Sequence, residues 1–182
     1  MARVDYDDFA RDNPQGWKKP SGPAAYLKRT FVLNPLKLAL VRLGRRTATS
    51  AQITPPLGIL SLAAYLRQQG HRIAFLIVDQ RLESSPLEEI TRRIAAFGAD
   101  MVGLSLLTPS AHTLPALTRQ LRVALPNSKI LLGGPHVTSF GAASLEGNEA
   151  DAGVTGEGEK ALEAIVSGKG DGAVFRNIPG LI

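Results

Sequence analysis

The chain has 182 residues, of which 44% are hydrophobic and 20% charged, and this composition is typical of a globular domain without a membrane-spanning segment. Its net charge of +5 comes from basic residues scattered along the sequence, and aromatic residues make up only 5%, so we expect no nucleic-acid partner. Cysteine is absent, which excludes disulfides, thiolate zinc sites and iron–sulfur ligands within this chain, and the polar N-terminus lacks the apolar core of a secretory signal, so the expected compartment is the cytoplasm.

The hydrophobic pattern predicts five strands that alternate with helices. Residues 1–35 form an extension without clear periodicity. The predicted strands cover residues 36–43, 72–79, 100–106, 129–132 and 151–155. Helices are expected over residues 57–69, from the Ser85-Pro86-Leu87-Glu88 capping box to Gly98, from a start within 110–114 to Pro126, and over 157–166, with a weaker short helix at 141–146.

Alternating strands and helices indicate an α/β domain with a parallel sheet covered on both faces. With right-handed crossovers, the expected architecture is flavodoxin-like, a Rossmann-like fold with strand order 2-1-3-4-5 and a crevice between the first and third strands. The predicted domain spans residues 36–168, and the glycine-rich tail over residues 169–182 is predicted to be a linker toward a further domain.

In this topology four strand-to-helix segments meet at the carboxyl edge of the sheet, where ligands of open α/β sheets bind. They are residues 44–56, 107–110, 133–140 and 156–159. The segments are rich in small, apolar and hydroxyl-bearing residues, which suits a large, mostly uncharged ligand. Two glycines, Gly133 and Gly134, end the fourth strand and let a bulky group approach the backbone. Substitution of Gly134 by leucine is therefore expected to block binding without unfolding the sheet.

Residues 156–161 match G-x-G-x-x-A, so a nucleotide- or flavin-binding domain of the same fold is an alternative. Glu157 and Glu159 in this segment would repel phosphates, however, and their carboxylates can instead accept hydrogen bonds from hydroxyl or amide groups. A third alternative is a domain that binds only a partner protein. No metal site is expected, because the chain has three isolated histidines: His71 lies at the opposite edge, and neither His112 nor His136 has carboxylates or cysteines at matching spacing.

Five segments in order resemble the cobalamin-binding N-terminal domain of cobalamin-dependent radical S-adenosylmethionine enzymes. They are Pro55 to Leu66, Gly70-His71, Ser105-Leu106-Leu107-Thr108-Pro109, Gly133-Gly134-Pro135-His136 and Gly156-Glu157-Gly158-Glu159. In the wider family, S-x-L follows the third strand and G-G follows the fourth, and both are present here. The resemblance covers residues 36–182 and implies that the domain binds cobalamin.

The resemblance also implies which residues contact the cofactor. Around the first segment they are Thr54, Pro55 and Leu57; in the third, Ser105, Leu106, Leu107 and Thr108; in the fourth, Gly133, Gly134, Pro135 and His136; and around the last, Thr155, Gly156, Glu157 and Gly158. Cobalamin's nucleotide tail would pass between the strands beside Ser105, Gly133 and Gly134. His136 would position the cofactor and not bind the metal. No catalytic residue is assigned to this chain.

One motif of the wider family, D-x-H-x-x-G after the first strand, is missing, because residues 44–56 contain no histidine. The resemblance therefore implies base-off cobalamin without a protein histidine ligand, in a module whose parent is expected to be a methyltransferase. The family's S-adenosylmethionine and [4Fe–4S] cluster bind in a downstream catalytic domain in cis, which this chain does not contain. Alone, the chain is expected not to perform radical chemistry.

Overall fold

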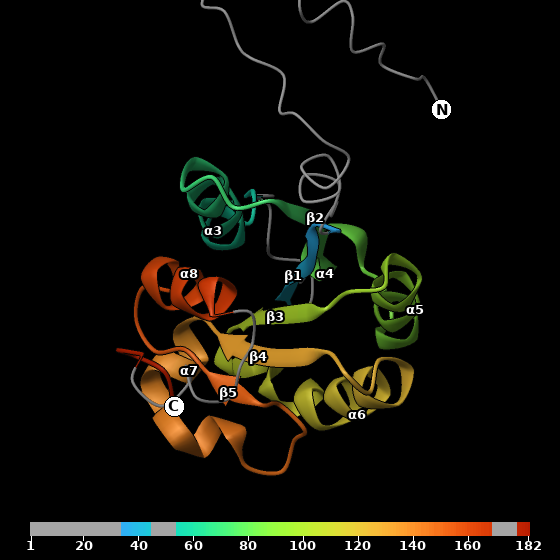
Figure 1. Ribbon diagram of the computed structural model, residues 1–182. Helices are drawn as coiled ribbons and strands as arrows, with labels where there is room; N and C mark the ends of the chain where they lie inside the picture. Colours follow the sequence, from blue (N-terminus) through green and yellow to red (C-terminus); the bar gives the residue numbers. More distant parts are fainter. Residues whose placement is uncertain (1–33, 45–53, 169–177) are drawn as a thin grey trace, which may run out of the picture. The chain divides into compact units, whose positions relative to one another are not determined.

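Five parallel strands form the central sheet of the structure, a computed structural model that describes residues 34–44, 54–168 and 178–182. The strands are β1 (Leu36–Leu43), β2 (Ile73–Asp79), β3 (Met101–Leu106), β4 (Lys129–Gly133) and β5 (Ala152–Gly153). Their order is β2-β1-β3-β4-β5, which confirms the predicted fold and strand order (Figure 1). Residues Pro35–Ile182 form one compact unit, whereas nearly all of the predicted extension lies outside the described residues.

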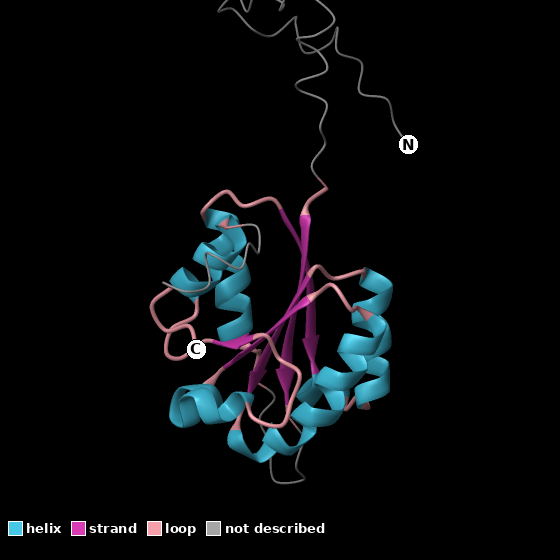
Figure 2. Ribbon diagram, turned by 60° about the horizontal axis from the view of Figure 1, so that its bottom comes forward, coloured by secondary structure: helices cyan, strands magenta, loops and turns pink. Residues whose placement is uncertain are grey.

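Helices cover both faces of the sheet (Figures 1 and 2). One face carries α3 (Leu57–Gln68) and α8 (Glu159–Ser167), and the other carries α5 (Leu87–Phe97) and α6 (Leu114–Ala124). Each face has its own buried cluster, because side chains alternate between the faces along a strand. In β1, for example, Leu38 and Leu40 pack toward α3 and α8, while Ala39 and Val41 pack toward α5 and α6.

The ends of two helices follow the expected chemistry. Gly98 caps α5 with φ 66°, a left-handed conformation that glycine adopts without strain. Pro115 lies in the first turn of α6, where its missing N–H leaves no hydrogen bond unmade.

The predicted capping box before α5 is wrong. Pro86, not Ser85, is the N-cap residue, and no side chain caps the helix. The Ser85 hydroxyl instead donates to the Glu83 carboxylate at 3.3 Å. Glu83 ends a short helix that the pattern did not predict, α4 (Gln80–Glu83), whose N-cap Asp79 accepts a hydrogen bond from the N–H of Arg81. The cap that forms therefore lies one helix earlier than expected.

Residues 133–140, predicted to be a loop, contain α7 (Pro135–Phe140), which a 3-10 helix (Gly141–Leu145) follows. Gly134 turns the chain out of β4 with φ 92°, and Pro135 starts the helix. A second 3-10 helix, Thr108–Thr113, separates β3 from α6. Two helical segments thus occupy the edge of the sheet where only loops were expected.

Residues 178–182, part of the predicted linker, lie along the edge of the sheet. Leu181 forms an antiparallel bridge with Val154, and Gly153 and Ile182 exchange two backbone hydrogen bonds of 2.9 Å. Ile178 is buried in the cluster beneath α3 and α8. None of the helices in the described part of the chain is long and apolar enough to cross a membrane.

Candidate functional site: a slot between the sheet and two helices

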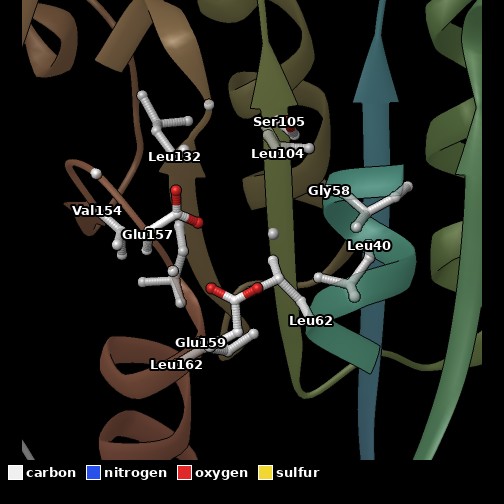
Figure 3. Close-up of a pocket in the computed structure, with 17 residues that line it drawn as sticks. Leu40, Gly58, Leu62, Leu104, Ser105, Leu132, Val154, Glu157, Glu159 and Leu162 are labelled. Atoms are coloured by element: carbon white, nitrogen blue, oxygen red, sulfur yellow. The ribbon is translucent and has the colours of Figure 1, made fainter. Parts of the chain in front are cut away.

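A slot of about 160 Å³ lies between the sheet and the pair of helices α3 and α8 (Figure 3). Strands β1, β3 and β4 form its floor, α3 and α8 flank it, and the segment before α8 closes one side. The lining residues are Leu40, Gly58, Ile59, Leu62, Gly103, Leu104, Ser105, Leu131, Leu132, Gly133, Gly134, Val154, Gly156, Glu157, Gly158, Glu159 and Leu162.

The slot is open above β4 because Gly133 carries no side chain, whereas at Gly103 the side chain of Leu40 occupies the space of the missing Cβ atom. Gly103 and Ser105 of β3 point to the α3–α8 face, and Ser105 is paired with Gly133 of β4. A Cβ atom at Gly133 would meet no other atom within 4 Å. A glycine whose missing side chain leaves open space above two central strands marks a place for a ligand rather than a packing requirement.

The neighbouring Gly134 has a different role. Its φ of 92° is unfavourable for other residues, and a Cβ atom there would lie 2.9 Å from the backbone N and O of Leu106. Leucine at Gly134 would therefore displace β3 itself, so the expectation that this substitution leaves the sheet intact is wrong. Gly133 is the position at which a side chain can fill the slot without a clash.

The walls of the slot are aliphatic. Leu40 and Leu131 come from the sheet, Ile59 and Leu62 from α3, and Leu162 from α8. Figure 3 shows Gly58, Ser105 and Leu132 near the carboxyl ends of the strands, and Leu40 and Leu62 further back along them. The slot thus passes from a mouth with small residues such as Gly58 and Ser105 to an apolar interior, a pattern typical of a small-molecule site.

Two carboxylates are the ionisable groups of the slot. Glu157 and Glu159 lie in the segment that joins β5 to α8, and no lysine or arginine lines the slot in the described part of the chain. Glu159 Oε1 accepts a 2.8 Å hydrogen bond from the hydroxyl of Ser61 on α3. The slot therefore carries negative charge and presents acceptors, which disfavours a phosphate inside it.

A second hydrogen bond joins the same two helices. The Tyr65 hydroxyl on α3 donates to Glu163 Oε2 on α8 at 2.7 Å. This hydrogen bond to the carboxylate, reinforced by partial burial and by the negative charge, raises the pKa of Tyr65 above its usual value of 10.0. His71 Nε2 lies 3.9 Å from the other Glu163 oxygen. Together with Ser61 and Glu159, these residues tie α3 to α8 over the slot.

Arg42 fixes the approach to α3. Its guanidinium pairs with the buried carboxylate of Asp79, with Nε 3.0 Å from Oδ1. It also donates to the carbonyl oxygens of Thr54 at 2.9 Å and Pro55 at 3.4 Å. The two predicted contact residues therefore face Arg42 with their backbone, and neither lines the slot.

Six of the predicted contact residues line the slot: Ser105, Gly133, Gly134, Gly156, Glu157 and Gly158. Leu106 does not, because it points to the opposite face and is buried beneath α5 and α6. Leu107 lines a separate hollow of about 850 Å³, beside α4 and the 3-10 helix. Leu57 is 70% exposed at the start of α3. Consecutive residues of a strand face opposite ways, which is why S-x-L cannot contribute all its side chains to one pocket.

The remaining predicted residues lie outside the slot. His136 is in α7, not in a loop; its ring packs against Phe140 at a centroid distance of 4.6 Å, and its Nδ1 lies 3.2 Å from Thr108 Oγ1. Pro135 is the first residue of the same helix. The Thr155 hydroxyl donates to the carbonyl of Gly180 at 3.0 Å. Within the described residues, no three His, Asp or Glu side chains converge as a metal site.

The sequence interpretation missed the apolar half of the slot. The missed residues are Leu40, Gly58, Ile59, Leu62, Gly103, Leu104, Leu131, Leu132, Val154 and Leu162, whereas Glu159, which also lines the slot, was identified from the sequence as a hydrogen-bond acceptor at this edge. Gly103, inside an otherwise apolar strand and two residues before Ser105, was the available signal, because an isolated glycine in a strand indicates a close approach. The leucines carry no such signal, since they match any buried face.

Comparisons with known proteins agree with this geometry. The B12 binding domain family matches residues 46–166. The chain belongs to the B12-binding domain family. Cobalamin is therefore the ligand that this domain binds. The slot opens at the carboxyl edge of the sheet.

Two solved structures share the fold. The first is OxsB, a cobalamin-dependent S-adenosylmethionine radical enzyme, in its complex with aqua-cobalamin and S-adenosylmethionine. It superposes on this chain with a TM-score of 0.66 at 18% sequence identity. The match covers 82% of this chain and 21% of the OxsB chain. Its apo form gives a TM-score of 0.57 at 17% identity, over 82% and 20%. An uncharacterized methyltransferase of Pyrococcus horikoshii is 29% identical over 156 residues, 85% of this chain and 32% of the relative. The chain thus spans about a third of that relative's length.

Proposed function

We propose that this B12-binding domain holds cobalamin base-off, with the base of the cofactor's nucleotide tail in the slot between the sheet and α3 and α8 and the phosphodiester outside it. The observation that carries the proposal is the open floor at Gly133, which leaves an aromatic-sized opening at the carboxyl edge. An apolar cavity of ~150 Å³ is enough for a benzene ring, and the slot measures about 160 Å³. The corrin ring would then lie above the edge, where Gly134 and Gly156 allow close approach.

We further propose that no histidine of this domain binds the cobalt. Residues 44–56 contain none, although residues 45–53 lie outside the described part of the chain. Of the three histidines, His136 packs against Thr108 and Phe140, His112 Nδ1 lies 2.9 Å from the carbonyl of Pro109, and His71 faces Glu163. Each has a structural partner of its own, which supports a cobalt whose lower face has no imidazole.

The parent protein is proposed to be a radical S-adenosylmethionine enzyme, with the present domain as its N-terminal module. Support comes from the shared fold with OxsB and from a relative, named a methyltransferase, that is about three times as long as the matched segment. The chain has no cysteine, so a [4Fe–4S] cluster and its S-adenosylmethionine would bind in another domain in cis. Methyl transfer through cobalamin is the reaction class we assign to that parent.

The alternative, a nucleotide or flavin in the same slot, is less well supported by the residues present. Glu157 and Glu159 would face the phosphates of such a ligand, and no basic side chain lines the slot within the described residues. Cobalamin carries a single phosphodiester, and its corrin amides can donate hydrogen bonds to these carboxylates.

A titration with hydroxocobalamin tests the proposal. Binding to the purified protein is expected to shift the absorption spectrum to that of base-off corrin. In Gly133→Val the new side chain occupies the slot, so the affinity should fall about ten- to a hundredfold while the melting temperature stays unchanged.

Ala64→Val is the matched control, because it places the same valine side chain on the exposed side of α3 outside the slot, and it should bind like the native protein. Base-on spectra would contradict the proposed binding mode. Equal affinity of Gly133→Val and the native protein would place the tail elsewhere.

A further inference from the structure

We infer that the slot selects the lower base of the cofactor: it accepts a benzimidazole and discriminates against a purine. The inference rests on the proposed function, since it concerns the part of cobalamin that the slot would hold. Cobamides share one corrin and differ in the base that ends the nucleotide tail. Dimethylbenzimidazole, the base of cobalamin, and adenine are two such bases, and they differ in how many hydrogen bonds they need.

The slot offers very few side-chain donors. Among the described residues that line it, only Ser105 has a hydroxyl hydrogen to donate, and the other polar side chains there, Glu157 and Glu159, are acceptors when ionised. The backbone of the floor is also committed, because Leu104 and Leu132 lie within the parallel ladders of β1, β3 and β4. A base held against this floor and the aliphatic walls, away from the N-terminal N–H groups of α3 and α8, must therefore do without most of the hydrogen bonds it makes to water.

The two bases respond differently to this environment. Dimethylbenzimidazole in the base-off state has one free ring nitrogen, and Ser105 alone could satisfy it, while its methyl groups match the aliphatic walls at Leu40, Leu62 and Leu162. Adenine keeps three ring nitrogens that accept hydrogen bonds, and one hydroxyl cannot satisfy them all. Each acceptor buried without a donor weakens binding by about tenfold.

The carboxylate of Glu159, at the side of the slot, does not supply the hydrogen bonds that adenine lacks. Glu159, the polar side chain beside Leu62 in Figure 3, already accepts from Ser61 with one oxygen. Its remaining oxygen could accept from the adenine amino group, but it leaves the ring nitrogens unpaired. Counting the hydrogen bonds that each base would lose, the slot favours dimethylbenzimidazole, which has fewer polar atoms than adenine.

The test measures dissociation constants for three corrinoids with the purified protein: cobalamin, the cobamide with adenine as lower base, and cobinamide, which has no nucleotide tail. We expect cobalamin to bind at least about tenfold more tightly than the adenine cobamide. Equal or tighter binding of the adenine cobamide would overturn the inference and leave the proposed function standing. If no corrinoid binds, both the inference and the proposed function fail.

A substitution in the slot wall tests whether the lack of hydrogen-bond donors causes the preference for cobalamin. Leu62→Gln places an amide donor in the slot, so the preference for cobalamin should shrink, with the adenine cobamide gaining affinity and cobalamin losing it. Leu60→Gln is the matched control, because Leu60 lies on the same helix, is 39% exposed and does not line the slot. Unchanged cobinamide affinity reports that each variant is folded. A preference that Leu62→Gln leaves unaltered would show that the slot walls do not set it.

Discussion

At the residue scale, the adjacent residues Gly133 and Gly134 each require glycine, but for different physical reasons. Gly133 leaves space that a ligand can use, since nothing lies within 4 Å of its would-be Cβ atom. Gly134 turns the chain with φ 92° against the backbone of Leu106. The pair G-G therefore combines one functional and one structural requirement, and substitutions at the two positions should separate them.

Gly134→Ala is expected to lower the free energy of unfolding by about 1–3 kcal/mol, because alanine disfavours a positive φ and its Cβ would press on β3. Urea denaturation measures the change. Gly133→Ala is the control and should change the free energy of unfolding by less than about 1 kcal/mol, the cost or gain of one alanine in a strand. If the two variants are equally stable, the structural role assigned to Gly134 is wrong.

At the scale of elements, α3 and α8 hold the slot between them although 98 residues separate each bonded pair of side chains. Ser61 with Glu159, and Tyr65 with Glu163, are hydrogen-bonded across the two helices. Neither pair is visible as a motif in the sequence. These hydrogen bonds add a polar connection between two helices that also share the buried cluster on this face of the sheet.

The Tyr65–Glu163 hydrogen bond predicts a dependence of stability on pH. Because its pKa is raised in the folded state, Tyr65 contributes stability that is fully present below pH 10.0, its ordinary pKa, and is lost as the pH rises through the higher folded value. The native protein should therefore be more stable than Tyr65→Phe at pH 8, and the difference should shrink as the pH rises beyond 10.

Chemical denaturation of both proteins between pH 8 and about pH 11 measures this difference. Tyr26→Phe, a tyrosine exchange in the N-terminal extension, is a control for the titration of tyrosine in general. A stability difference that stays constant across this range would show that the hydrogen bond does not persist in solution.

At the scale of the whole molecule, the domain is one sheet with two cores, and the slot interrupts only one of them. The core beneath α5 and α6 is continuous, with Val102, Leu104 and Leu106 of β3 all buried. On the other face, Gly103 and Ser105 of β3 contribute little side-chain volume, so the core beneath α3 and α8 is less complete. We therefore expect the ligand to stabilise the whole domain by filling the less complete side.

A thermal shift measures this stabilisation. At a free cobalamin concentration one hundred times the dissociation constant, binding adds about 2.7 kcal/mol, which corresponds to a rise in melting temperature of about 5–10 °C for a domain of this size. Cobinamide at the same free concentration as cobalamin is the control for the corrin contacts. No shift with either corrinoid would contradict cobalamin binding by the isolated domain.

Much of the architecture could be predicted from the sequence. Apolar runs between turn residues predicted β1 over its full length and α3 to within one residue, and the alternation of strands with helices predicted the order of the sheet. These features depend on local pattern and on general rules of chain connection, which a sequence carries directly. The end of α5 at Gly98 was predictable for the same reason.

Other features depend on contacts that no local pattern records. Ser85 fits a capping box, yet the short helix α4 and the pairing of Asp79 with Arg42 set where α5 begins. The segment after Gly134 has few helix formers but becomes α7, because Val137 is buried against the sheet. Tertiary packing overrides local preference in both places.

The sequence by itself determined the fold class, the strand order and the small residues at the carboxyl edge, since composition and periodicity encode them. Only the tertiary structure decided which of these residues share the slot. Ser105 and Leu106 are neighbours in the chain but face opposite cores, whereas Ser105 and Gly133 meet across the sheet. Side-chain direction in a strand changes with every residue, so a binding face becomes definite only when strands and helices are packed together.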